Sequence, residues 1–341
     1  MVFTRIQFVG EEVMQQAISV GITGTGHALP DQIITNAFFQ KCAGLSDKWI
    51  LARTGIRERR RAGVNETASA LGAQAAGKAL TSADLKAEEI ELIICTTISP
   101  DMPMPSTACF IQALIGAKNA VCFDLSAACS GFLYGLEVAE KMVRSGAYRN
   151  ALLISVDLMT RWLDYTDVQT CTLFGDGAGA VVLERVESKR GILGTKLYSD
   201  GGFADLVFIS AKDPGSNATQ RVDSGKCKLR MDGKRTFKAA VKAMASASQN
   251  LLFLLGMCAS KIDLIVPHQG NQRISDAVAD ALNISTEKVF SNIARVGNTT
   301  SASIPIALDE CVRMGKIRSG SLVLLTAFGS GATSGASVVR F

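Results

Sequence analysis

The sequence has very little histidine, and its cysteines form no metal-binding pattern. Among 341 residues only His27 and His268 are histidines, and the nine cysteines are scattered without a CxxC pair. A structural zinc site needs four clustered cysteine or histidine ligands, so we expect no metal. An odd number of cysteines also argues against a disulfide framework and favours a reducing compartment.

The sequence also lacks the long apolar runs of membrane proteins. A bilayer-spanning helix needs roughly 18 consecutive apolar residues, and the run 250–259, among the longest, falls well short. Glu11 and Glu12 interrupt the region where a signal peptide would be apolar. The formal net charge of +5 is too small to indicate nucleic-acid binding, although it suits an acidic partner. We therefore expect a cytoplasmic globular protein that binds neither membranes nor nucleic acid.

Nucleotide-binding motifs are weak or missing. The chain has no P-loop, and GTGHAL (24–29) lacks the third glycine of a dinucleotide fingerprint. GDGAGA (175–180) runs into an apolar strand, so its glycines do not place a phosphate at a helix N-terminus. NAD-linked oxidoreduction is therefore the least favoured class of function.

Apolar runs alternate with amphipathic segments along most of the chain. Buried strands are predicted at 18–24, 90–98, 120–125, 151–157 and 262–268. Helices are predicted at 67–80, 107–115, 131–144, 236–255 and 273–282. This alternation predicts an α/β fold with largely parallel sheets that are covered on both faces.

The two halves of the chain share an internal repeat. Residues 142–157 resemble residues 313–329, and each segment reads as a helix end followed by a strand. Residues 174–186 resemble residues 328–341, and each reads as a glycine turn followed by a second strand. We therefore predict a duplicated α/β unit with halves 18–187 and 188–341, preceded by an extension at 1–17. Segment 211–235 lacks apolar periodicity and is predicted to be a long binding loop or lid.

Cys129 stands where an apolar strand gives way to an amphipathic helix, in FDLSAACSGF (123–132). Its neighbours are all small, which suits a thiol that must admit a substrate. A helix N-terminus favours the thiolate and lowers a cysteine pKa. The alternative is a small core hydrophobe, the usual role of a cysteine. We interpret Cys129 as a candidate nucleophile.

Two further residues are candidate partners of Cys129. His268 ends the strand IDLIVPH (262–268), at the sheet edge where α/β proteins place their sites, although it could be a capped surface histidine. Asn298, in RVGNTTSASIP (295–305), either caps the next helix or donates its amide to an oxyanion. It is expected to occupy the place in the second half that Cys129 holds in the first. His27 follows the first strand and is expected to be structural.

An arginine-rich segment, WILARTGIRERRRA (49–62), surrounds Trp49. A solvated helix end explains many such runs. An aromatic plane beside guanidinium groups also suits an adenine and phosphates.

Together these features make residues 18–341 resemble β-ketoacyl-acyl-carrier-protein synthase III, a thiolase-fold condensing enzyme that initiates bacterial fatty acid synthesis. The resemblance implies two βαβαβαββ halves in αβαβα layers. It rests on seven ordered landmarks: SDKWILARTGIRERR (46–60), DLSAACSGF (124–132), FGDGAGA (174–180), MDGKRTFK (231–238), VPHQGN (266–271), GNTTSASIP (297–305) and GASVVRF (335–341).

The resemblance implies a Cys–His–Asn triad of Cys129, His268 and Asn298. Cys129 would take an acyl group from acetyl-CoA or a similar acyl-CoA, with the N–H groups of Cys129 and Ser330 as the oxyanion hole. His268 and Asn298 would then stabilise the enolate formed by decarboxylation of malonyl-acyl-carrier protein. The products would be 3-oxoacyl-carrier protein, CoA and CO2, and no cofactor is implied.

Binding residues are implied by the same resemblance. Lys238 and Arg273 match positions that meet the acidic carrier protein. Met104 matches a residue that closes the acyl pocket of a partner subunit, which implies a homodimer. The residues implied for coenzyme A and its pantetheine tunnel are Trp49, Arg53, Thr54, Gly233, Phe237 and Asn271.

Three positions depart from the family pattern. Val168 replaces an arginine that stacks on the adenine, which leaves open whether the donor is CoA-bound or carrier-bound. Gly270 stands where alanine is usual, and Ser330 stands where glycine is usual. The alternatives are a related condensing enzyme of quinolone or polyketide metabolism, a papain-like thiol hydrolase, and a binding-only member.

Overall fold

The computed structural model describes residues 18–209 and 228–341. The expected extension 1–17 and most of the expected loop 211–235 lie outside the described residues. The strands are β1 (Ser19–Ala28), β2 (Gln32–Thr35), β3 (Glu58–Arg61), β4 (Leu92–Thr96), β5 (Val121–Leu125), β6 (Asn150–Leu158), β7 (Asp176–Val186), β8 (Gly191–Ser199), β9 (Val207–Ile209), β10 (Leu229–Met231), β11 (Leu264–Pro267), β12 (Leu322–Gly329) and β13 (Thr333–Arg340). The helices are α1 (Asn36–Ala43), α2 (Asp47–Thr54), α3 (Ala68–Ala83), α4 (Thr107–Ile115), α5 (Gly131–Arg144), α6 (Gly233–Leu254), α7 (Gln272–Ala281), α8 (Ile293–Val296) and α9 (Ser303–Arg313). Two 3-10 turns belong to the site, η2 (Ala128–Ser130) and η7 (Thr300–Ala302).

Each half of the chain builds one sheet. The first has the strand order β1-β7-β6-β4-β5, and the second has the order β11-β12-β13-β8. Among the strands of the described residues, only the pairs β4–β5, β4–β6 and β11–β12 are parallel, so the prediction of largely parallel sheets was wrong. The reason is that β6–β7 and β12–β13 are joined without a helical crossover and therefore run antiparallel.

The halves repeat one order of elements. The first half runs β1, α3, β4, α4, β5, α5, β6 and β7, which is the expected βαβαβαββ unit. The second follows it as β8, α6, β11, α7, α9, β12 and β13, but its third strand is reduced to one bridge between Ile265 and Val289. The predicted boundary at 187/188 falls between β7 and β8.

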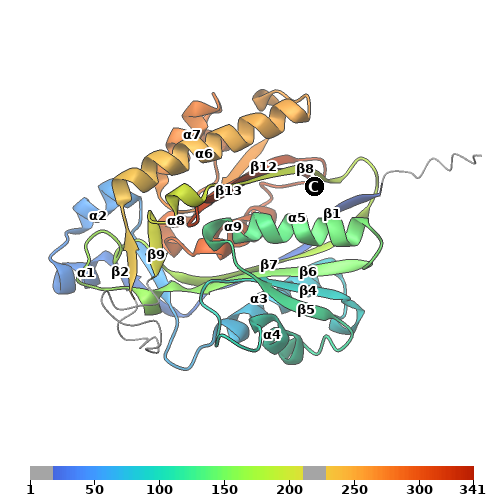
Figure 1. The fold of residues 1–341 in the computed structure, drawn as a ribbon, viewed down its shortest axis with the longest axis horizontal. Coiled ribbons are helices and arrows are strands. Elements are labelled where there is room, and N and C mark those ends of the chain that lie inside the picture. Colours follow the sequence, from blue (N-terminus) through green and yellow to red (C-terminus); the bar gives the residue numbers. More distant parts are fainter. Residues whose placement is uncertain (1–17, 210–227) are drawn as a thin grey trace, which may run out of the picture.

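The elements stack in five layers, which Figure 1 shows nearly edge-on. Helices α3 and α4 pack on the outer face of the first sheet, and α6 and α7 pack on the outer face of the second. Helices α5 and α9 fill the space between the sheets, in a core to which both halves contribute. The αβαβα arrangement is therefore confirmed. No helix within the described ranges combines the length and apolarity that crossing a bilayer requires.

Two glycines of GDGAGA explain how close α9 lies to β7. They lie inside the strand and not in a turn before it. A Cβ on Gly179 would lie 2.7 Å from the backbone nitrogen of Ile306, and a Cβ on Gly177 would lie 2.9 Å from the Ile306 side chain. Their function is thus close packing, which brings the start of α9 up to the first sheet.

Part of the expected loop 211–235 is regular structure. Residues 229–231 form β10, which pairs with β9, and α6 begins at Gly233. The Asp232 side chain accepts a hydrogen bond from the Arg235 backbone N–H and so caps the helix. Asp232 could have indicated from the sequence that the helix begins at Gly233 and not at the predicted residue 236.

Candidate active site

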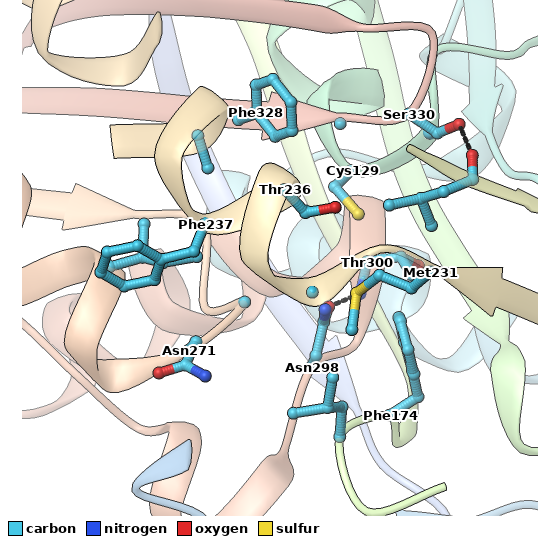
Figure 2. A pocket seen from close by; sticks show the side chains of 18 of the residues that line it. Cys129, Phe174, Met231, Thr236, Phe237, Asn271, Asn298, Thr300, Phe328 and Ser330 are labelled. Atoms are coloured by element: carbon cyan, nitrogen blue, oxygen red, sulfur yellow. Dashed lines mark hydrogen bonds between the residues drawn. The ribbon is translucent and has the colours of Figure 1, made fainter. Parts of the chain in front are cut away.

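One cavity of about 930 Å³ gathers nearly all of the predicted site residues. Figure 2 shows several of them projecting into the same space from different elements. Met104 is the exception: it does not line this cavity, and its side chain is largely exposed. The predicted residues that do line it are Trp49, Arg53, Thr54, Cys129, Gly233, Phe237, Lys238, His268, Asn271, Arg273, Asn298 and Ser330.

Cys129 lies on turn η2, between β5 and α5. The preceding Ala128 has a φ of 47°, a left-handed conformation that costs a non-glycine residue on the order of 1 kcal/mol. Gly329 packs so close to the turn that a Cβ there would lie 2.8 Å from the Cys129 backbone nitrogen and 2.9 Å from that of Ser130. Only glycine fits here, and the thiol points into the cavity (Figure 2).

The surroundings of Cys129 favour the neutral thiol. Burial, and to a smaller extent the charge of Asp157, raise the pKa of the Cys129 thiol to about 12. The expectation of a lowered pKa was therefore wrong, because the enclosed surroundings of the sulfur outweigh the helix terminus. The thiol must lose its proton when it attacks.

His268 follows β11 directly and is almost fully buried. Its Nδ1 lies 2.7 Å from the Oγ of Ser303, the first residue of α9, and this hydrogen bond orients the ring. Burial lowers the pKa of His268 to about 4, so the imidazole is neutral near pH 7. A neutral imidazole can accept a proton at one nitrogen and donate a hydrogen bond from the other.

Asn298 is held by its backbone and by one end of its side chain. Its N–H donates to the Leu173 carbonyl at 2.9 Å, and its own carbonyl accepts from the Gly175 N–H at 3.0 Å. Its Oδ1 accepts from the Thr300 N–H at 2.8 Å. The amide oxygen thus supports the turn before α9, while the NH2 end remains available to a ligand. The expected cap of the next helix is not formed, since α9 begins after Ala302 without a side-chain cap.

The nitrogens of His268 and Asn298 converge on one place. A Cβ on Gly270 would lie 2.9 Å from Nε2 of His268 and 3.8 Å from Nδ2 of Asn298. The two nitrogens therefore lie close together, and all three residues line the cavity. Two hydrogen-bond donors aimed at one point suit an oxyanion or enolate oxygen.

Ser330 lies in the turn between β12 and β13, which packs against the Cys129 turn. Thr333 donates its hydroxyl to the Ala127 carbonyl at 3.1 Å, and Ser130 donates to the Thr333 carbonyl at 3.1 Å. The Ser330 hydroxyl donates to the carbonyl of Val207 in β9 (Figure 2). The side chain that replaces the usual glycine therefore ties this turn to β9.

The inner part of the cavity is apolar. Sequence reasoning missed this lining, because its members come from separate elements and each looks like an ordinary core residue. They belong to or pack on one hydrophobic cluster and are suited to an acyl chain. These residues are Ile98, Met159, Leu173, Phe174, Val207, Ile209, Leu229 and Met231.

Cations and aromatic rings gather on the walls that reach the surface. The Arg53 guanidinium lies 4.3 Å from the centre of the Trp49 ring, and that of Arg273 lies 5.5 Å from the Phe237 ring. Val168 lines the same cavity and is partly exposed, where an arginine would add a further cation. These pairs fit an anionic ligand with a planar group.

Two predicted binding residues have polar atoms that are already engaged. The Thr54 hydroxyl donates to the Ile50 carbonyl at 2.8 Å and accepts from the Ile56 N–H at 3.0 Å. Asn271 donates to the Arg53 carbonyl at 3.0 Å and caps α7. Both residues shape the wall of the cavity through these bonds.

A solvated helix end would expose all arginines of residues 49–62, but one of them is buried. Arg59 is almost fully buried and donates to the Asn36 side chain at 2.8 Å and to the Thr172 carbonyl at 2.5 Å. Burial lowers the pKa of Arg59 to about 10. His27 has the expected structural role, since its Nδ1 contacts Asp309 of α9 at 2.5 Å.

Comparison with known proteins gives consistent matches. The family model described as 3-oxoacyl-(acyl-carrier-protein) synthase III matches residues 123–201, and its C-terminal counterpart matches residues 254–341. A beta-ketoacyl-(acyl-carrier-protein) synthase III of Caldanaerobacter subterraneus subsp. tengcongensis is 44% identical over 331 residues, which are 96% of this chain and 99% of that protein.

Solved structures agree with these matches. The 3-oxoacyl-(acyl-carrier-protein) synthase III of Aquifex aeolicus is 43% identical with a TM-score of 0.89, and the match covers 94% of this chain and all of that one. A priming beta-ketosynthase from a polyketide biosynthetic pathway is 32% identical, also with a TM-score of 0.89, over 95% of this chain and 96% of that one.

Proposed function

The chain belongs to the β-ketoacyl-acyl-carrier-protein synthase III family, and from this premise we propose how its residues perform the reaction. It is an acyltransferase of the condensing type. It joins an acyl-CoA primer to malonyl-acyl-carrier protein and so initiates fatty acid synthesis. One observation carries the assignment of residues: Cys129, His268 and Asn298 come from separate segments and line the same cavity.

In the first half-reaction the Cys129 sulfur attacks the acyl-CoA carbonyl. The N–H groups of Cys129 and Ser330 stabilise the tetrahedral oxyanion. Neutral His268 accepts the thiol proton and returns it to the departing CoA thiolate, so the imidazole is neutral again when acyl-Cys129 has formed. The apolar inner cavity holds the acyl chain.

In the second half-reaction malonyl-carrier protein enters. The bond between its carboxylate and C2 breaks, CO2 leaves, and the electron pair forms an enolate whose oxygen accepts hydrogen bonds from His268 and Asn298. Nε2 of His268 accepts the thiol proton in the first half-reaction, which requires the proton on Nδ1, whereas it donates to the enolate in the second. Between the two the ring must therefore exchange its proton from Nδ1 to Nε2 with solvent, after which Nδ1 accepts a hydrogen bond from the Ser303 hydroxyl. C2 then attacks the acyl carbonyl, and Cys129 leaves as a thiolate that takes a proton from solvent. No metal or cofactor enters these steps.

The partners follow from the surroundings of the cavity. Trp49 and Arg53 suit the nucleotide end of CoA, and Lys238 and Arg273 suit an acidic carrier protein. Gly233 and Phe237 border the path between the surface and Cys129. We place the enzyme in the cytoplasm, where its substrates are made.

A homodimer is part of this proposal. Strand β5 is an edge strand of the first sheet, and no strand of the described part of the chain pairs with its outer side. Val121 of β5, Leu114 of α4 and Met104, which precedes α4, are exposed apolar residues. Pairing of β5 with that of a second copy would cover them and bring Met104 to the partner's acyl pocket. Sedimentation velocity tests this, and a monomer at micromolar concentration would contradict it.

Turnover tests the function as a whole. Purified enzyme is incubated with acetyl-CoA and malonyl-carrier protein, and 3-oxoacyl-carrier protein is identified by mass spectrometry. Branched, longer and aromatic acyl-CoAs are compared in parallel, because the similarity to a polyketide priming ketosynthase makes a role in secondary metabolism the second candidate. Product from acetyl-CoA supports fatty acid initiation, whereas product from the other primers alone supports the second candidate.

A further inference from the structure

Asp157, near the end of β6, is a fully buried carboxylate that the reaction described above does not use. Its Oδ1 accepts from the Ile98 N–H at 2.8 Å and from the Ser99 hydroxyl at 3.1 Å, in the turn after β4. Its Oδ2 accepts from the Ser301 hydroxyl at 2.6 Å, from the Ser301 N–H at 3.2 Å and from the Thr300 hydroxyl. One carboxylate therefore joins both halves of the chain.

This carboxylate has an unusual environment for its charge. Among the described residues, no lysine or arginine forms an ion pair with it, and burial raises the pKa of Asp157. Burying an uncompensated carboxylate is costly, so its neighbours must supply compensating hydrogen bonds. The hydroxyl and N–H donors of two separate turns do so, which makes both turns dependent on it.

The turn bound by Oδ2 carries Asn298. Thr300 has a φ of 49°, a strained conformation for a residue with a branched side chain. Its hydroxyl donates to Asp157, and its backbone N–H donates to Oδ1 of Asn298 at 2.8 Å. A continuous chain of hydrogen bonds thus runs from Asp157 through Thr300 to the amide that borders the cavity.

Turn η7, which Asp157 binds, has a counterpart in the first half, turn η2. Turns η2 and η7 each begin with a left-handed residue, Ala128 or Thr300, and each leads into a helix between the sheets. The counterpart of Cys129 is therefore Ser301, and not Asn298 as expected. Beside the Cys129 N–H, strand β12 places Gly329, which has no side chain to bond it, whereas beside the Ser301 N–H, strand β6 places the carboxylate of Asp157.

We propose that Asp157 is a positioning residue: its carboxylate permanently fills the oxyanion-like site of the second half and thereby aims the Asn298 amide at the enolate. The expected effect on rate rests on the proposed function, whereas the hydrogen bonds that connect Asp157 with Asn298 do not depend on it. The two copies of the turn then have different roles: the backbone N–H of η2 is open to the substrate, and that of η7 is bonded by the protein's own carboxylate.

The charge of Asp157 also acts on the first half-reaction. Because it raises the pKa of the Cys129 thiol, its removal should make the thiol more reactive. Loss of Asp157 is therefore expected to affect the two half-reactions in opposite directions. A general loss of structure would lower both.

The test compares Asp157→Asn with Asp176→Asn. Asp176 is also a fully buried carboxylate, and it accepts from the Thr160 hydroxyl at 2.6 Å and from the Ala62 N–H at 2.8 Å, with no bond to η7. Release of CO2 from malonyl-carrier protein and alkylation of Cys129 by iodoacetamide are measured for each. We expect D157N to lower decarboxylation about 10²-fold and to raise the alkylation rate, and D176N to leave the ratio of the two rates unchanged.

Parallel loss of both rates in D157N, or unchanged decarboxylation, would overturn the proposal. The double variant of D157N with Asn298→Ala should lose little beyond N298A alone, because both act on one amide; additive losses would overturn it as well. A wild type that fails to release CO2 would refute the proposed function instead. The crystal structure of D157N then decides the geometry, and an Asn298 amide that keeps its bond to Thr300 N–H refutes the positioning role.

Discussion

His268 and Asn298 present Nε2 and Nδ2 to one side of Gly270, where a single added Cβ would lie 2.9 Å from the first and 3.8 Å from the second. The two side chains come from different turns, one after β11 and the other before α9, and each is oriented by a hydrogen bond at its far end. Two neutral donors that share a target suit a decarboxylation, since the step creates a negative charge but needs no strong base.

Asn298→Ala should separate the half-reactions. Removing one donor to a developing oxyanion typically costs about 10²–10³ in rate, and we expect that loss in CO2 release from malonyl-carrier protein. Acylation of Cys129 should change by less than about threefold, since Asn298 has no part in that step. Equal losses in both assays would contradict the assignment.

The reactivity of the free thiol should follow its raised pKa. With the pKa of Cys129 raised to about 12, only the small thiolate fraction reacts with iodoacetamide. The alkylation rate should rise about tenfold for each unit between pH 7 and 10, without a plateau. Peptide mass spectrometry separates Cys129 from the exposed Cys42 and Cys258. A plateau below pH 8 would show a lowered pKa.

Burial of His268 should make the fold sensitive to acid. Its pKa is lowered from 6.5 to about 4, so between these values the unfolded chain binds a proton that the folded chain does not. The associated stability is present above pH 6.5 and is lost as pH falls toward 4, by about 3 kcal/mol. Urea unfolding of wild type and His268→Gln checks this, because the variant cannot titrate there. A pH-independent difference between the two proteins would contradict it.

Ser330 should influence which acyl groups are accepted. Ser330→Gly keeps the backbone N–H of the oxyanion hole but removes the hydroxyl that holds Val207 of β9, a wall of the inner cavity. One such hydrogen bond is worth about 1 kcal/mol, so we expect acetyl transfer within about fivefold of wild type and relatively faster transfer of longer chains. Ser330→Ala serves as a matched variant and should behave alike. Unchanged selectivity in both would refute the role of this bond.

Much of the fold could be predicted because apolar periodicity reports burial directly. The predicted helices 107–115 and 131–144 agree with α4 and α5, and a helix followed by two strands ends each half, although the glycine turn expected between those strands is present only between β12 and β13. Strand direction was not predictable from the same pattern. A direct turn makes the next strand antiparallel and a helical crossover makes it parallel, yet the apolar strands that precede the two kinds of connection look alike.

The sequence indicated which residues would line one cavity, but not their electrostatics. Its small neighbours made Cys129 a candidate nucleophile, yet the pKa of its thiol depends on burial by elements distant in the sequence, which no local pattern records. Asp157 was missed although it is the single charged residue of a largely apolar strand, ALLISVD (151–157). The equivalence of Cys129 with Ser301 is recognised from the left-handed residues that precede them, Ala128 and Thr300. Sequence spacing does not predict such backbone angles.

The most direct test of the central claim is the intact mass of the protein after incubation with a panel of acyl-CoAs, with Cys129→Ala as the control. We predict a gain of one acyl group in the wild type, none in C129A, and loss of the added mass when malonyl-carrier protein is supplied. The same gain in C129A, or no gain from any acyl-CoA or acyl-carrier protein, would contradict an acyl-Cys129 intermediate.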